Sequence, residues 1–434
     1  MTSNSPLGSS WSDRYLAFID EIITGTMKGK IASKEQVYRL LSEALAQGMG
    51  EIFERCLLER QATVQAQLDP GPGAERGTEM EQAKALRQSR ALKVLAEAWG
   101  RWQTENQAKS ASAAAIADLQ AAAPEDRLSV LFQILDPNQT YVFNRKQIEL
   151  LAQDLSQAEA ALQPLAQGLQ QGLRAFERME GHLIGWMYDA PQRAVGFESS
   201  RQQVSPWQYW SQHSDSALAQ QLFRGQTENR SAQELAEALA EVNLPDWIEL
   251  AILLRGMQGG LIAWFDKQPY SRTGGQNMAA MTFLTFALLW SELSGGFRAN
   301  GQLSTQAAQT LARASFQLAL QILRAFAQRD NFPLYGGMVA SFSGEGFRET
   351  MDYLDQPLRA LEKTQEKARI LTLLAYSQGW LGQIDRSLVL HEEALALAQE
   401  AADQRCVVAN LNHLSRMQLK QQAFEGAIAR ASGL

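Results

Sequence analysis

A segment near the end of the chain occurs twice, 40 residues apart, and this duplication limits the possible folds more than any other feature. Residues 371–375 recur as residues 411–415, and residues 382–387 recur as residues 422–427. Each copy has the pattern of a helix, a short turn and a second helix whose small side chains face the first. A hairpin of this kind cannot bury its apolar face alone, so successive copies stack and leave a groove. The sequence therefore predicts stacked helical hairpins over residues 366–434.

The repeated segment resembles tetratricopeptide repeats, specifically the longer bacterial variety. The resemblance rests on a leucine and a small residue in the first helix, on the turn, and on small residues in the second helix. These residues are Leu374-Ala375, Leu381-Gly382, Ser387 and Ala394, and the second copy has Ser415 in place of the family's glycine. Over residues 366–434 the resemblance implies an α-solenoid whose groove binds other proteins. It therefore implies a scaffold or adaptor that is not an enzyme.

The rest of the chain has the composition of an all-α protein, because strong helix formers such as Ala, Leu, Gln, Glu and Arg dominate it. We expect a helical bundle or array followed by the C-terminal hairpins. The length of 434 residues allows two or three domains. We place an N-terminal helical domain at 1–188 with an exposed loop at about 68–80, a linker at 189–205, a central helical domain at 206–350 and the repeat region at 351–434.

Charge, cysteine content and motifs argue against several classes of function. A net charge of −7 and a pI near 5.4 give no basic footprint for nucleic acid. Cys56 and Cys406 lie far apart in the sequence, and we interpret them as buried, reduced thiols. The four histidines share no spacing typical of metal ligands, so we expect no metal and no cofactor. The sequence contains no P-loop, no Gly-x-Ser-x-Gly and no His-Glu-x-x-His motif, which favours a function without catalysis.

Two stretches bear on the location of the protein. Residues 1–12 are polar and no apolar signal segment follows them, so we expect a cytoplasmic protein. Residues 274–291 carry no charge, but only about thirteen of them are strongly apolar, fewer than the ~20 that a membrane-spanning helix needs. We interpret this stretch as a buried central helix and expect no integral membrane span.

The groove of the hairpin stack is the first predicted binding site. In the resembling family the first helix of each hairpin lines the concave face. The corresponding residues here are Arg369, Thr372, Tyr376, Trp380, Asn412, Arg416 and Lys420. Three cations, an amide and two aromatic rings suit an acidic or extended segment of a partner protein. The same residues also fit an ordinary solvated helix face, and that interpretation stays open.

An enzyme or a sensor of a small ligand is the alternative function, with the repeats serving only for recruitment. Its site would lie among the glycine-rich segments 271–277 and 335–346. In the first of these, a predicted loop before a helix places backbone N–H groups and an arginine around an anion. The residues of that predicted anion site are Arg272, Thr273, Gly274 and Gly275.

Three smaller features complete the sequence-based expectations. The aromatic group at residues 207–210 is either core or a partly exposed patch for a partner. His391 and His413 fall on neighbouring helices of the two copies and can approach one another; we interpret both as structural or exposed. The last predicted helix stops at Leu434 without a polar capping helix, so either the natural chain continues or self-association covers this end.

Overall fold

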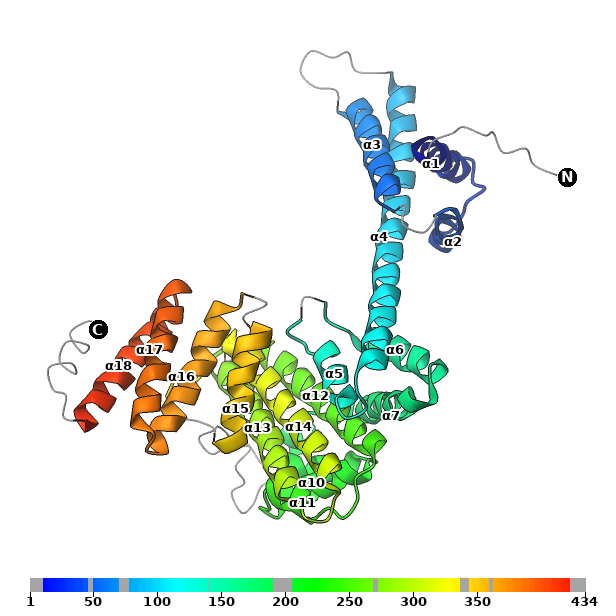
Figure 1. The fold of residues 1–434 in the computed structure, drawn as a ribbon. Coiled ribbons are helices and arrows are strands. Elements are labelled where there is room, and N and C mark those ends of the chain that lie inside the picture. Colours follow the sequence, from blue (N-terminus) through cyan, green and yellow to red (C-terminus); the bar gives the residue numbers. More distant parts are fainter. Residues whose placement is uncertain are drawn as a thin grey trace. The chain divides into compact units, whose positions relative to one another are not determined.

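The computed structural model describes residues 11–45, 50–69, 78–139, 141–189, 205–267, 272–335, 343–358 and 362–421. Over these residues the chain is helical and contains no strand, which confirms the predicted all-α class (Figure 1). The chain divides into two compact units, residues 1–113 and 114–434. Most of the predicted loop at 68–80 and of the predicted linker at 189–205 lies outside the described residues.

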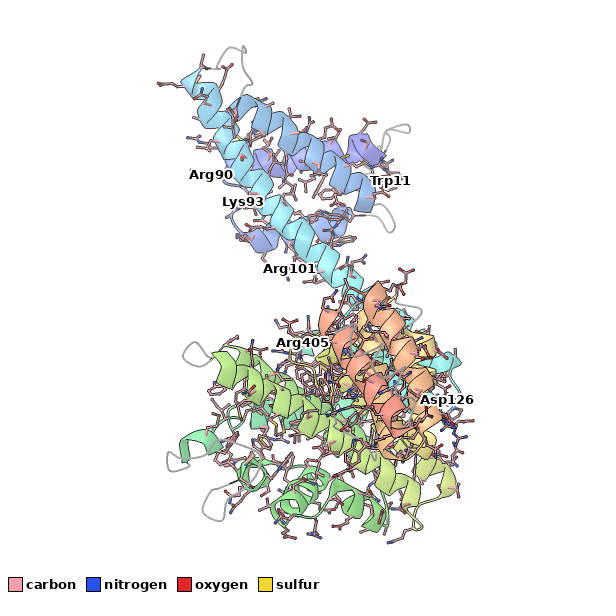
Figure 2. All side chains as sticks on the ribbon, turned by 90° about the vertical axis from the view of Figure 1, so that its left-hand side faces the viewer. Trp11, Arg90, Lys93, Arg101, Asp126 and Arg405 are labelled. Atoms are coloured by element: carbon pink, nitrogen blue, oxygen red, sulfur yellow. The ribbon has the colours of Figure 1, made fainter. Side chains whose placement is uncertain are left out.

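The first unit is built from α1 (Trp11–Met27), α2 (Lys34–Ala44), α3 (Gly50–Leu68) and most of α4 (Glu79–Ala121). Phe53 lies at the centre of its core, 5.6 Å from the ring of Tyr15 and 5.0 Å from that of Trp99. Cys56 is buried and unpaired in the same core, as predicted. Arg101 ties α4 to α2, since its guanidinium lies 3.9 Å above the ring of Tyr38 (Figure 2).

The second unit contains the remaining helices in an order that the structure gives without strands among the described residues. They are α5 (Arg127–Ile134), α6 (Arg145–Gln157), α7 (Gln163–Glu180), α8 (Trp186–Asp189), α9 (Pro206–His213), α10 (Ala217–Thr227), α11 (Ala232–Ala238), α12 (Leu244–Asp266), α13 (Arg272–Ala299), α14 (Thr305–Ala327), α15 (Gly344–Tyr353), α16 (Thr364–Trp380), α17 (Ile384–Glu400) and α18 (Gln404–Lys420). A short 3-10 turn precedes α7, and a π-helical turn, Leu354–Leu358, follows α15.

Helices α7 and α12 pack at very short range through glycines. A Cβ at Gly172 would lie 2.6 Å from the Cβ of Ile252, and one turn earlier Gly168 faces Ile248 in the same way. Further along, the roles exchange, because Gly256 on α12 accepts the ring of Phe176 from α7. Since the paired positions increase together in both helices, α7 and α12 run parallel. Residues before and after the segment 189–205 therefore belong to one compact unit, and the predicted domain boundary there differs from the observed division at residue 113.

The core of the second unit lies between α12, α13 and α14. Trp247 and Trp290 are buried there with their ring centroids 5.5 Å apart. Among the described residues, α12 and residues 274–299 are long and apolar enough to cross a membrane by length and composition alone. Half of the apolar stretch of α12 and 56% of that of α13 are buried inside this unit. The apolar side of α13 is thus part of the core, as predicted.

Helices α16, α17 and α18 repeat a single geometry. Each has 17 residues, and they begin 20 residues apart, at positions 364, 384 and 404. Gly382 and Ala402 hold the same place in the two turns, with φ of 79° and 54°. In both turns the next N–H bonds to the carbonyl five residues back at 2.9 Å, from Gln383 to Gln378 and from Asp403 to Ala398. The predicted succession of helix, turn and helix is confirmed up to residue 421, and the predicted last helix lies outside the described residues.

Small residues let these three helices approach closely. Ala375 and Ala394 are buried, and Ser387 donates a hydrogen bond to the carbonyl of Ala375 at 2.8 Å. A buried arginine then joins α16 to the rest of the unit. Arg324 of α14 pairs with Glu366 of α16 at 2.6 Å, and neither side chain is more than 8% exposed. The three-helix array is therefore attached to the core by a charged contact inside the unit.

Candidate protein-binding face

The structure separates the predicted groove residues into two groups. Arg369 and Thr372 are buried, with Arg369 only 4% exposed, so neither lines an open groove and the prediction for these two is wrong. The reason is that helix α16 lies between α14 on one side and the pair α17 and α18 on the other. The other five, Tyr376, Trp380, Asn412, Arg416 and Lys420, are half-buried or exposed.

Arg369 and Thr372 hold α18 against α16 instead of meeting a partner. The guanidinium of Arg369 pairs with the buried carboxylate of Asp403, which also accepts a bond from the N–H of Cys406 at the start of α18. This pairing and the cap lower the pKa of Asp403 against the raising effect of its burial. Thr372 accepts a 2.9 Å bond from the amide of Asn410. These bonds fix the first turn of α18 and so place its outward side chains.

Aromatic rings from three segments meet beside α18. His413 of α18 lies 5.1 Å from the ring of Tyr376 on α16 and 4.8 Å from that of Tyr335, in the loop after α14. Trp380 lies 6.3 Å from Tyr376, and its side chain is the most exposed large ring described, at 69%. Tyr335 is 51% exposed. Exposed aromatic side chains grouped in this way are typical of binding surfaces, because they offer large contact area at little cost in conformational entropy.

One stripe of α18 continues this surface with positive charge. Its exposed or half-buried members recur at helical spacing, and they are Arg405, Val408, Asn412, Arg416 and Lys420. The helix contains no Asp or Glu between its ends. The three cations make no ion pair with any described residue, whereas the acid at its N-cap, Asp403, is consumed by Arg369. We call the surface formed by this stripe with Tyr335, Tyr376 and Trp380 the basic–aromatic face.

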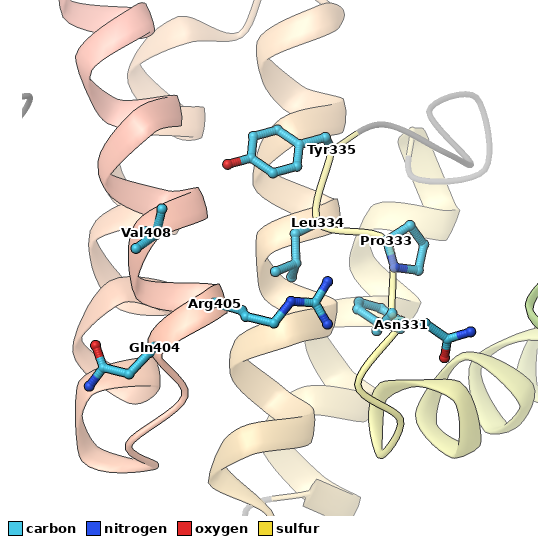
Figure 3. A pocket seen from close by; sticks show the side chains of 8 residues that line it. Asn331, Pro333, Leu334, Tyr335, Gln404, Arg405 and Val408 are labelled. Carbon is cyan, nitrogen blue, oxygen red and sulfur yellow. The ribbon is translucent and has the colours of Figure 1, made fainter. Parts of the chain in front are cut away.

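A cavity of about 550 Å³ opens at one end of the basic–aromatic face (Figure 3). Its walls come from the loop after α14 and from the first two turns of α18. The lining residues are Asn331, Phe332, Pro333, Leu334, Tyr335, Gln404, Arg405 and Val408. Figure 3 shows the side chain of Arg405 reaching from α18 toward the loop, with Val408 one turn further along. The cavity therefore offers an apolar floor beside a cation.

Two stacked histidines lie beneath this face. The rings of His391 and His413 are 4.8 Å apart, as the sequence allowed. His391 donates to the amide oxygen of Asn410 at 2.8 Å, and His413 donates to the carbonyl of Leu334 at 2.8 Å. Burial lowers the pKa of His391 to about 3 and also lowers the pKa of His413, an effect to which the charge of Arg416 adds. Both rings are therefore neutral near pH 7, and His413 holds the loop that carries Tyr335.

Acidification is expected to destabilise the second unit through His391. The folded pKa is about 3 and the unfolded value is near 6.5, so only the unfolded chain takes up a proton between these values. The contribution is complete above pH 6.5 and is lost as the pH falls toward 3, by about 2 kcal/mol at pH 5. Urea denaturation at pH 7.5 and pH 5 should show this loss in the natural chain and a smaller one in His391→Gln. Equal pH dependence in both proteins would contradict it.

The other predicted surfaces have less support. Trp207 and Trp210 are buried, so the interpretation of residues 207–210 as a partly exposed patch is wrong. Helix α13 begins at Arg272, which places Gly274 and Gly275 inside its first turns rather than in a loop before it. The side chains of Arg272 and Thr273 and most of the segment 335–346 lie outside the described residues. Among the described residues no group of His, Cys, Asp and Glu is arranged to hold a metal ion.

Similarity to known proteins does not extend this picture. The chain matches no protein-family model, no curated protein and no solved structure. The geometry of the basic–aromatic face is therefore the basis for a functional proposal. Sequence reasoning missed Tyr335, Arg405 and Val408, although the last two fall on the same helical stripe as Asn412 and Arg416.

Proposed function

We propose that the protein is a non-enzymatic scaffold or adaptor whose C-terminal helices form the start of a tetratricopeptide-like solenoid. The equal lengths of α16, α17 and α18 and the identical turns at Gly382 and Ala402 support this proposal. So do the buried small residues at Ala375 and Ser387, since close helix approach needs small side chains at such positions. Stacked helices of this kind present an extended surface on which another chain can lie.

The basic–aromatic face carries the proposal. The protein as a whole has a net charge of −7, yet α18 exposes Arg405, Arg416 and Lys420 with no acid beside them. Unpaired cations of one sign next to exposed aromatic rings favour an acidic partner, because opposite charge speeds encounter and rings supply the buried contact area. The expected partner is an acidic, extended segment of another protein.

The spacing of the cations sets the length of that segment. Arg405 and Arg416 are eleven residues apart on one helix, which corresponds to about 16 Å along its axis. An extended peptide covers this distance with about five residues. We therefore expect two acidic residues separated by about four others, with an apolar side chain between them that contacts Val408 or the aromatic rings.

Charge reversal on α18 should abolish this binding. Peptides selected from a random display library on the full chain are expected to be rich in Asp, Glu and apolar residues. The double variant Arg416→Glu and Lys420→Glu should bind a selected peptide at least about tenfold more weakly, because two attractive charges become repulsive. Affinity measured by fluorescence anisotropy at two salt concentrations tests this, and higher salt should weaken the natural chain's binding.

The matched control keeps the same change in net charge. Arg174 on α7 and Arg224 on α10 are exposed and lie on other helices, so Arg174→Glu with Arg224→Glu should leave the affinity unchanged. A selected pool without acidic residues would sink the proposal. An equal loss in both double variants would also sink it, because a general effect of net charge would then explain the data.

A further inference from the structure

A second cavity, of about 800 Å³, lies between α15 and the turn that joins α16 to α17. It is separate from the basic–aromatic face, with which it shares no lining residue. Its lining residues are Ser343, Gly344, Phe347, Arg348, Gln378, Leu381, Gln383 and Arg386. Two of these are cations, three carry hydroxyl or amide groups, and none is an acid. In a chain with an excess of acidic residues, such a lining is selective for anions.

The two arginines come from different helices and are available to a ligand. Arg386 of α17 lies 4.9 Å from the ring of Phe347 on α15 and makes no ion pair with a described residue. Arg348 of α15 has only a long contact of 3.8 Å with Glu345, and its side chain is 74% exposed. An exposed pair at this distance contributes little, so a better acceptor can replace it. Both guanidiniums are thus free to bond an anion.

The backbone adds positive potential at the same place. Helix α15, of 10 residues, begins at Gly344, and helix α17, of 17 residues, begins at Ile384, directly after Gln383 of the lining. Neither helix has a side-chain cap on its first N–H groups. Unbonded N–H groups at a helix start attract negative charge. These two helix starts reinforce the charge of the two arginines.

We propose that this cavity binds the phosphoryl group of a small organic phosphate. A carboxylate has two oxygens, whereas the lining presents donors from two arginines, two glutamine amides and a serine, which the additional oxygens of a phosphoryl group satisfy better. The volume far exceeds that of inorganic phosphate. Phe347 and Leu381 supply an apolar wall for the organic part of the ligand. The proposal does not depend on the scaffold function.

Phenyl phosphate, inorganic phosphate and benzoate are the probes for a test by isothermal titration with the full chain. Phenyl phosphate should bind most tightly, because it combines the anion with a ring. In Arg386→Gln its affinity should fall about tenfold, as expected for loss of a charge-assisted hydrogen bond. The double variant Arg348→Gln with Arg386→Gln should show no binding. Both arginines are exposed, so the variants should fold, and circular dichroism checks this.

Arg174→Gln is the matched control, because it removes one exposed arginine of the same unit outside the cavity. It should leave the affinity for phenyl phosphate unchanged. Absence of binding by the natural chain would overturn the proposal, as would binding that survives the double variant. Benzoate bound as tightly as phenyl phosphate would overturn the assignment to a phosphoryl group. The peptide experiments on α18 are read separately, so either proposal can fail alone.

Discussion

A Gly172→Leu variant is expected to lose about 3 kcal/mol or more of the free energy of unfolding of residues 114–434. A Cβ at Gly172 would already lie 2.6 Å from the Cβ of Ile252 and 3.0 Å from the carbonyl oxygen of Glu249. A leucine adds three more carbons in the same direction, and the backbone oxygen cannot turn away. The helices α7 and α12 must therefore separate. Urea denaturation followed by tryptophan fluorescence measures the loss.

Gly259→Leu is the matched control on the same helix pair. No atom lies within 4 Å of a Cβ at Gly259, and leucine is the better helix former, so this variant should be neutral or stabilised by up to about 1 kcal/mol. Equal stability of Gly172→Leu and Gly259→Leu would contradict the packing argument.

Exchanging the large and small residues offers a second check. Two helical turns on, the natural chain has the opposite arrangement, with Phe176 on α7 against Gly256 on α12. The pair Gly172→Ile with Ile252→Gly copies that arrangement one turn earlier. It should be more stable than Gly172→Ile alone, with a coupling energy of about 1–3 kcal/mol. A purely additive result would show that these two residues do not meet.

Helix positions are predictable here because local signals determine them. Ser33 and Ser231 begin α2 and α11 by accepting bonds from the N–H groups of Gln36 and Glu234, both at 3.1 Å, as their Ser-x-x-Gln and Ser-x-x-Glu patterns predict. The same holds for the turn at Gly382, where a positive φ favours glycine. These features depend on residues within one helical turn.

Burial of the groove residues depends on distant contacts, and the sequence pattern does not contain them. Arg369 and Arg416 are both arginines on first helices of the repeat, so their predicted roles are alike. The first is buried because Asp403, 34 residues later, neutralises it and because the carbonyls of Ala327 and Arg329 accept its bonds at 2.8 and 2.6 Å. Arg416 has no such partner and stays exposed.

The domain boundary fails for a related reason. Proline and glycine in the segment 189–205 predict an irregular connection, but they do not tell which helices pack across it. The signal for that packing was present as glycines four residues apart, at Gly168 and Gly172 on α7 and at Gly256 and Gly260 on α12. Such glycines allow close contact without identifying the partner helix, so the pairing needs the structure.

Removing Arg324 is expected to cost about 3–5 kcal/mol, because it leaves buried carboxylates without a counter-charge. Arg324 is fully buried; it donates to Glu366 at 2.6 Å and to the carbonyl of Asn138 at 3.1 Å, and it lies 3.7 Å from Asp136. In Arg324→Met the helix α16 loses its charged attachment to α14. The double variant Arg324→Met with Glu366→Met should recover part of the loss, because it removes the strongest unpaired charge and fills the space with apolar atoms.

The control is an exposed ion pair on the same helix. Arg313 of α14 pairs with Asp126 at 3.0 Å, but the two side chains are 58% and 49% exposed, so Arg313→Met should cost less than about 1 kcal/mol. The pH dependence adds an independent criterion. Without Arg324 the folded pKa of Glu366 rises above its unfolded value, and the deficit of Arg324→Met should shrink as the pH falls from 7 toward 5. Equal costs for Arg324→Met and Arg313→Met, with a deficit that does not change with pH, would mean that the buried contact does not hold α16 in place.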